Sequence, residues 1–180
     1  MKTRWALFIS GQGSNMSALL DQKWDLDIAL VVSSSLKAQG LKRAQRSGIP
    51  TIVLDAKIDW QKLSTEIQRL RATHIFLLGF MKIVPPEFLK SWTGVILNVH
   101  PSLLPHYPGL KSMERAYQDG ADMGITVHRV NEQVDAGHVV LQKTVVPRDT
   151  VKKISFESAE QKMHQAEYAL VRRAVERAYA

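Results

Sequence analysis

The stretch Trp5-Ala6-Leu7-Phe8-Ile9-Ser10-Gly11-Gln12-Gly13-Ser14-Asn15 is an apolar run that passes through a glycine turn into a helical pattern. A continuous apolar run is typical of a strand that is covered on both faces, as in a parallel sheet flanked by helices. A strand, a glycine turn and a helix in this order open many doubly wound α/β sheets. We therefore expect this stretch to set the fold class.

Similar apolar runs recur along the first half of the chain and alternate with segments of helical period. This alternation predicts parallel pairing through right-handed crossovers. The predicted strands are 5–9, 27–33, 51–54, 74–78 and 95–99, and the predicted helices are 15–22, 38–47 and 60–72.

After Pro101 the pattern changes to a loop that contains Pro105, Pro108 and Gly109. We expect a short helix at 113–118, two strands at 124–130 and 138–146 that extend the sheet in antiparallel or mixed fashion, and a helix from about residue 153. The predicted fold class is α/β: a single domain over residues 1–180 with a doubly wound, mostly parallel sheet and helices on both faces.

Composition excludes several classes of protein. With 45% hydrophobic and 23% charged residues in 180, the chain matches an ordinary globular domain rather than a disordered or fibrous one. It has no cysteine, which rules out disulfides, thiolate metal sites and a cysteine nucleophile. No apolar run is long enough for a signal peptide core or a membrane span, so we expect a cytoplasmic protein with no membrane partner.

The formal net charge is +7, but the basic residues are scattered rather than clustered. Attraction of a small anionic substrate explains this excess without a nucleic-acid partner. We expect a small-molecule substrate, no nucleic acid, and a monomer or homodimer.

The glycine turn offers an anion site, because backbone N–H groups at the start of a helix attract phosphate. Gly13, Ser14 and Asn15 are the candidate residues. Met16 stands where a dinucleotide motif would have its third glycine, and Ser33-Ser34-Ser35 stands where its acidic residue would be, so NAD is disfavoured. The alternative is a tight strand-to-helix turn that Ser14 caps.

Asn98 and His100 lie two residues apart at the end of a predicted strand, so their side chains share a face. In an open parallel sheet the carboxyl ends of the strands are where ligands bind. An amide donor and an imidazole together suit stabilisation of an oxyanion and transfer of a proton. The alternative is a polar strand end whose histidine is satisfied by the following proline-rich loop.

Asp135 lies in a turn between two apolar strands, where aspartate is common for local reasons. If the turn folds over the sheet end, Asp135 faces His100 and favours its imidazolium form. We interpret His74 as a strand start, His106 as a loop residue and His128 as part of one strand face. No histidine pair has metal-site spacing, so we predict no metal.

Several motifs, in order along the chain, resemble those of a known family. They are ISGQGSN (9–15), GFMKI (79–83), NVHPSLLP (98–105), YPG (107–109), TVH (126–128) and DAG (135–137). This pattern resembles the phosphoribosylglycinamide formyltransferases, folate-dependent enzymes of purine synthesis. Related transfer-RNA formyltransferases share the Asn-x-His and Leu-Leu-Pro pattern, but YPGL (107–110) favours the purine family.

The resemblance implies transfer of a formyl group from 10-formyltetrahydrofolate, a co-substrate, to the amine of glycinamide ribonucleotide. Asn98 and His100 would hydrogen-bond the formyl oxygen, and Asp135 would keep His100 protonated. The glycine turn at 13–15 would hold the substrate phosphate. Met81, Lys82, Ile83 and Val84 would line the folate site, with backbone groups reading the pterin and Asn98 contributing.

The chain departs from the family at Lys82 and Val84, where arginine and leucine are usual, and in the C-terminal helix. There His164 stands where the family has an acidic residue for the substrate. Two alternatives follow: a formyltransferase for another amino sugar or phosphorylated amine, and a non-catalytic folate- and phosphate-binding relative.

Overall fold

The computed structural model describes residues 3–21, 26–55 and 57–179, and the chain divides into two compact units. The first unit extends to Leu97, and the second extends from Asn98 to Ala178. The boundary falls inside strand β5 (Val95–His100). The single domain expected from the sequence stays a prediction.

The first unit is a parallel α/β layer. Its strands β1 (Trp5–Ile9), β2 (Ile28–Ser33), β3 (Thr51–Val53) and β4 (His74–Leu77) follow the order β3-β2-β1-β4, and each neighbouring pair is parallel. All five residues of β1 are fully buried, as its apolar run predicts. The predicted strands of this unit are confirmed to within one residue at each end.

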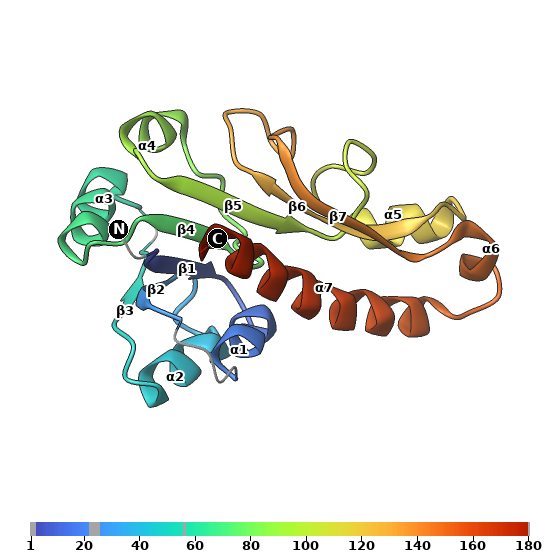
Figure 1. The fold of residues 1–180 in the computed structure, drawn as a ribbon, viewed down its shortest axis with the longest axis horizontal. Coiled ribbons are helices and arrows are strands. Elements are labelled where there is room, and N and C mark those ends of the chain that lie inside the picture. The colour runs from blue at the N-terminus through green and yellow to red at the C-terminus, as the bar shows by residue number, and fades with distance from the viewer. Residues whose placement is uncertain (1–2, 22–25, 56, 180) are drawn as a thin grey trace. The chain divides into compact units, whose positions relative to one another are not determined.

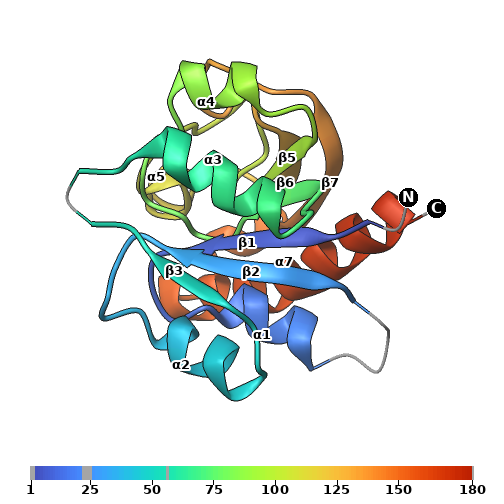
Figure 2. The same ribbon diagram turned by 90° about the vertical axis from the view of Figure 1, so that its left-hand side faces the viewer.

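Helices cover both faces of this layer. Figure 2 shows α1 (Ser14–Leu20) and α2 (Gln39–Arg46) on one side of the strands and α3 (Trp60–Arg69) on the other. The three predicted helices are confirmed, although the predicted end of the first one at Gln22 lies outside the described residues. The helix α4 (Pro86–Ser91) was not predicted.

The second unit contains the end of β5, a hairpin and three helices. Strands β6 (Met123–Arg129) and β7 (Val139–Val146) pair antiparallel, with Val127 opposite Leu141, and run side by side in Figure 1. The helices are α5 (Ser112–Gln118), α6 (Arg148–Val151) and α7 (Phe156–Tyr179). The hairpin, α5 and α7 are confirmed, whereas α6 was not predicted.

Helix α7 buries most of an apolar stripe whose members recur every three or four residues, as expected for a packing surface. Ala159, Met163, Leu170 and Ala174 are each at most 6% exposed, whereas Ala166 of the same stripe is partly exposed. Since the described strands are mostly parallel, with β6–β7 antiparallel, and helices flank them, the predicted α/β fold class is confirmed.

Candidate active site

The second unit brings Asn98, His100 and Asp135 together. His100 is the last residue of β5, and its ring Nδ1 lies 3.4 Å from Asp135 Oδ2. Asn98 Nδ2 lies 3.3 Å from the other carboxylate oxygen, Oδ1. The His100 and Asp135 side chains are only 8% and 9% exposed. These three groups therefore form one nearly buried polar cluster.

Both ring nitrogens of His100 face hydrogen-bond acceptors. On the side away from Asp135, Nε2 lies 3.0 Å from the Tyr107 carbonyl oxygen. A carbonyl and a carboxylate can only accept hydrogen bonds, so both neighbours of the ring are acceptors. The loop alternative considered from the sequence thus holds as well, because the proline-rich loop does bind His100.

Asp135 has an unusual backbone and several donors around its carboxylate. Its φ is 54°, in the left-handed region, and Oδ2 accepts a 2.8 Å hydrogen bond from the Gly109 N–H. Burial acts to raise the pKa of Asp135, but contact with the His128 ring, the Gly109 N–H and the charge of His100 act more strongly in the opposite direction. The net effect lowers its pKa, so Asp135 is ionised at neutral pH.

His128 belongs to the same cluster, which the sequence did not reveal. It is 2% exposed on β6, and its Nε2 lies 3.2 Å from Asn98 Nδ2 and 3.5 Å from Asp135 Oδ1. Its Nδ1 lies 2.9 Å from the Arg129 carbonyl oxygen. The signal available in the sequence was that His128 lies two residues after Thr126, so the two side chains share one face of the predicted strand.

A second hydrogen-bond network fixes the loop that follows β5. The fully buried Thr126 hydroxyl donates to the Ser102 carbonyl (2.7 Å) and accepts from the Leu104 N–H (3.1 Å). Gln142 Nε2 donates to the Leu104 carbonyl at 2.9 Å and to Thr126 Oγ1 at 2.8 Å. The chain leading to the Tyr107 carbonyl is therefore tied to the β6–β7 hairpin.

The glycine turn in the first unit leads directly into helix α1. Gly13 is the N-cap of α1 with φ 69°, and no side chain caps this helix. Ser14 is therefore the first helical residue and does not cap the helix as the alternative required. A Cβ at position 13 would lie 2.9 Å from the Gly40 Cα, so only glycine fits. Asn15 is 8% exposed, and its Oδ1 has no hydrogen-bond partner.

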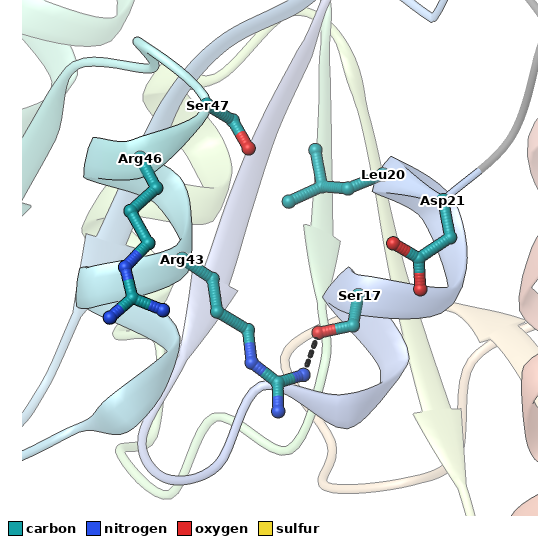
Figure 3. Close-up of a pocket in the computed structure, with 6 residues that line it drawn as sticks. All are labelled: Ser17, Leu20, Asp21, Arg43, Arg46 and Ser47. Atoms are coloured by element: carbon teal, nitrogen blue, oxygen red, sulfur yellow. Dashed lines mark hydrogen bonds between the residues drawn. The ribbon is translucent and has the colours of Figure 1, made fainter.

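A surface pocket of about 410 Å³ lies between α1 and α2, close in sequence to this turn. In Figure 3 its lining is mixed: Ser17, Leu20, Asp21, Arg43, Arg46 and Ser47. Arg43 donates to the Ser17 hydroxyl, and that hydroxyl donates to the Gly13 carbonyl at 3.1 Å. Arg43 of α2 is thus linked to the glycine turn through the Ser17 hydroxyl.

The predicted folate residues form a loop of the first unit. Met81 and Ile83 are 64% and 76% exposed, Lys82 is exposed and Val84 is 8% exposed. The Met81 N–H donates to Ser10 Oγ at 2.8 Å, so this backbone group is already engaged. The loop therefore presents two exposed apolar side chains, those of Met81 and Ile83.

His164 lies on α7 in the second unit, one turn from Glu167. Its Nδ1 is 3.5 Å from Glu167 Oε2, and the two side chains are 46% and 12% exposed. The hydrogen bond to Glu167 is the main cause that raises the pKa of His164; burial opposes it, and the charges of Glu167 and Glu160 add to it. The Glu167 carboxylate thus lies beside His164, whereas the family resemblance implied an acidic residue at position 164 itself.

Residues 3–21, 26–55 and 57–179 hold no group of three or more histidine, aspartate or glutamate side chains placed to bind a metal ion. Within the same part of the chain no helix is long and apolar enough to cross a membrane.

Comparison with known proteins identifies relatives along almost the whole chain. A phosphoribosylglycinamide formyltransferase of Haemophilus influenzae is 40% identical over 169 residues, which are 87% of this chain and 80% of that protein. The trifunctional purine biosynthetic protein adenosine-3 of Drosophila melanogaster is 36% identical over 182 residues, 93% of this chain, but the chain spans only 13% of that protein.

Solved structures agree with the sequence relatives. The crystal structure of glycinamide ribonucleotide transformylase 1 from Geobacillus kaustophilus superposes with a TM-score of 0.89 at 30% identity, and the match covers 100% of both chains. The sequence model described as formyl transferase matches residues 3–175. With this match, and with relatives above 30% identity over most of its length, the chain belongs to the formyl transferase family.

Proposed function

We propose that this chain transfers the formyl group of 10-formyltetrahydrofolate to the amine of N1-(5-phosphoribosyl)glycinamide, the reaction that supplies a formylated intermediate of purine synthesis. The observation that carries the proposal is the buried cluster of Asn98, His100 and Asp135, in which His100 Nδ1 lies 3.4 Å from an ionised carboxylate. The names of relatives that align along most of the chain support the choice of substrates.

The proposed reaction needs hydrogen-bond donors for the formyl oxygen and a group that transfers a proton, and the cluster can supply both. The amine nitrogen attacks the formyl carbon, a C–N bond forms, the bond from that carbon to the folate nitrogen breaks, and the amine proton ends on that nitrogen. While the formyl oxygen carries negative charge, N–H donors from Asn98 and His100 stabilise it. Asp135 holds His100 in its cationic form, and the ring relays the proton.

The resting structure requires a change of partners before the formyl oxygen is bound. His100 Nε2 donates to the Tyr107 carbonyl, and Asn98 donates to Asp135 at 3.3 Å. Hydrogen bonds of this type are usually 2.7 to 3.2 Å long, so the Asn98–Asp135 contact is weak. We expect it to exchange for the formyl oxygen at little cost.

The binding roles follow the two loops of the first unit. We propose that the backbone N–H groups at Gly13, Ser14 and Asn15 hold the substrate phosphate, since the helix start has no side-chain cap to compete. Met81, Lys82, Ile83 and Val84 are proposed to hold the folate, because exposed apolar side chains on a loop suit a flat aromatic ligand. Residues 1–180 would act as one cytoplasmic formyltransferase domain, as a monomer or homodimer.

One observation favours a second acceptor. His164 carries a raised pKa and lies on α7 beside the nearly buried Glu167. A cation in place of the expected carboxylate would suit an amine substrate with an additional anionic group. The second candidate function is therefore formyl transfer to another phosphorylated or sugar-linked amine.

The test is a steady-state assay with purified protein, 10-formyltetrahydrofolate and either glycinamide ribonucleotide or a panel of other amines. We expect the highest kcat/KM for glycinamide ribonucleotide. Preference for another amine selects the second candidate, and folate binding without any turnover selects a non-catalytic relative. The variant Asn98→Ala should lose about 10²- to 10³-fold in kcat, as other sites do when an oxyanion donor is removed.

A further inference from the structure

The Ser10 hydroxyl lies among the ends of three parallel strands of the first unit, and the proposed reaction assigns it no role. Ser10 directly follows β1, Ser34 directly follows β2, and Met81 lies four residues after the end of β4. In the sheet order β2-β1-β4, the strand that leads to Ser10 is the middle one. Ser10 therefore has a strand end on each side.

The paired residues of these strands end just before Ser10. On one side the last pair is Ile9 with Ser33, and on the other side it is Phe8 with Leu77. Beyond these pairs the three segments continue as loops. A connection between the loops therefore has to involve a side chain.

The Ser10 side chain makes this connection on both sides. Its Oγ accepts a 2.8 Å hydrogen bond from the Met81 N–H and lies 2.5 Å from Ser34 Oγ. A backbone N–H can only donate, so Ser10 is the acceptor for Met81. A hydroxyl has two lone pairs and one proton, so this acceptor role is compatible with a bond to Ser34 in either direction.

The loop at 79–84 is held by two apolar contacts and by this hydrogen bond. The Phe80 ring packs edge-on against Phe8 with a centroid distance of 5.2 Å, and Val84 is 8% exposed. Residues 81–83, which lie between these two anchors, are exposed. The bond at Met81 therefore fixes the point at which the exposed part of the loop begins.

We infer that Ser10 is a positioning residue for the loop at 79–84, which it holds in place for the folate through the Met81 N–H. Ser10 belongs to the motif ISGQGSN (9–15), whose resemblance implies a role at the substrate phosphate, yet its contact is with the other loop. The inference rests on the proposed function in one respect, the ligand that this loop holds. The bond between Ser10 and Met81 is independent of that ligand.

Three substitutions separate this role from a general effect on the strand ends. Ser10→Ala removes the acceptor for the Met81 N–H. Ser34→Ala is the matched control, because it removes the neighbouring hydroxyl and leaves Ser10 Oγ in place. Ser10→Thr keeps a hydroxyl at position 10 and tests whether the acceptor itself is what matters.

We expect Ser10→Ala to raise the KM for 10-formyltetrahydrofolate, and the Kd of tetrahydrofolate in calorimetry, about 3- to 10-fold, the effect of losing one hydrogen bond. The KM for glycinamide ribonucleotide and kcat should stay within about twofold, since the bond acts on one ligand only. Ser34→Ala and Ser10→Thr should both bind tetrahydrofolate within about twofold of the parent. A rise confined to the KM for the acceptor, equal effects of the two alanine substitutions, or a threonine variant as weak as Ser10→Ala would overturn the inference.

Amide hydrogen exchange of the parent protein gives a readout that needs neither ligand nor variant. The Met81 amide should exchange at least about tenfold more slowly than in an unfolded chain, because Ser10 holds its proton. Exchange at the unfolded rate would overturn the inference. A parent that binds no tetrahydrofolate would instead refute the proposed folate site, and the exchange rate would still show whether Ser10 holds the loop.

Discussion

The substitution Asp135→Asn removes one negative charge from the cluster while keeping the size of the side chain. Asparagine has nearly the same shape and tolerates the left-handed φ of 54° at this position. Its amide oxygen can still accept the hydrogen bond from the Gly109 N–H. The variant loses the negative charge 3.4 Å from His100 Nδ1, and its NH2 group replaces the oxygen that accepts from Asn98 Nδ2.

The size of the effect follows from that distance. Two unit charges 3.4 Å apart attract by about 5 kcal/mol at an effective dielectric constant of about 20. Part of this is cancelled by the cost of removing both groups from water, and a hydrogen bond to a charged group contributes about 1.5 to 3 kcal/mol net. At 1.36 kcal/mol per factor of ten, kcat should fall about 10- to 150-fold.

The assay is steady-state formyl transfer at neutral pH with the Asp135→Asn protein. KM for the phosphorylated acceptor should stay within about threefold, since the charge is proposed to act on the transition state. Asp149→Asn is the control, because it makes the same chemical change at an exposed residue of α6. A circular dichroism melt of each variant checks the fold.

If Asp135→Asn, folded like the parent, keeps more than about half of the parent kcat, the charge pair contributes almost nothing to the rate-limiting barrier and Asp135 does not act as proposed. A loss confined to KM would also contradict it, since that result would make Asp135 a binding group.

The same carboxylate predicts a pH dependence of stability. The pKa of Asp135 in the folded protein lies below its value in the unfolded chain. Its contribution is therefore fully present above the unfolded pKa of about 3.9 and is lost as the pH falls through the folded pKa. Urea unfolding of parent and Asp135→Asn proteins should differ at pH 6, and the difference should decline from about pH 4 downward as the pH falls through the lowered folded pKa. A difference that grows toward acid pH would have the wrong sign.

Two further predictions concern other parts of the chain. Gly13→Ala should reduce the free energy of unfolding by about 2 to 4 kcal/mol, because a Cβ there combines a left-handed φ with a 2.9 Å approach to Gly40. The control is Gly11→Ala, which should change the free energy of unfolding little because a Cβ at position 11 meets nothing within 4 Å. Equal effects of the two substitutions in denaturant melts would exclude this explanation. The raised pKa of His164 means that its pairing with Glu167 stabilises the fold below about pH 6.5 and is lost as the pH rises through the folded pKa. His164→Gln should therefore destabilise the protein at pH 5.5 by less than about 1 kcal/mol, since the ring is nearly half exposed, and should match the parent at high pH; a difference that persists there would refute the pairing.

Local patterns in the sequence predicted most of the fold. The run at β1 was identifiable as a strand because both of its faces are buried, and such burial leaves an uninterrupted apolar stretch. Helices α4 and α6 were missed for a physical reason. Each has six residues or fewer and begins directly after a proline, so neither is long enough to show a helical period.

The candidate site was only partly predictable. That Asn98 and His100 share a face follows from strand geometry, but the approach of Asp135 depends on how the 130–138 turn returns to β6. The turn closes tightly at Gly137, where a Cβ would lie 1.6 Å from the Arg129 carbonyl oxygen. The place of His128 in the cluster could not be predicted, because a buried histidine on a strand has the same sequence pattern whatever its side chain contacts.

The cluster combines a catalytic requirement with a stable resting state. A buried imidazole and a buried amide would each be costly without polar partners, and here each has two: Asp135 and the Tyr107 carbonyl for His100, and His128 and Asp135 for Asn98. The longest of these bonds, 3.3 to 3.4 Å, all involve the Asp135 carboxylate, whose own shortest bond is the 2.8 Å one from Gly109. A carboxylate held by a backbone N–H keeps its place when Asn98 turns to another acceptor. The donors can therefore be exchanged while the Asp135 charge stays fixed, which is the arrangement that the proposed transition-state stabilisation requires.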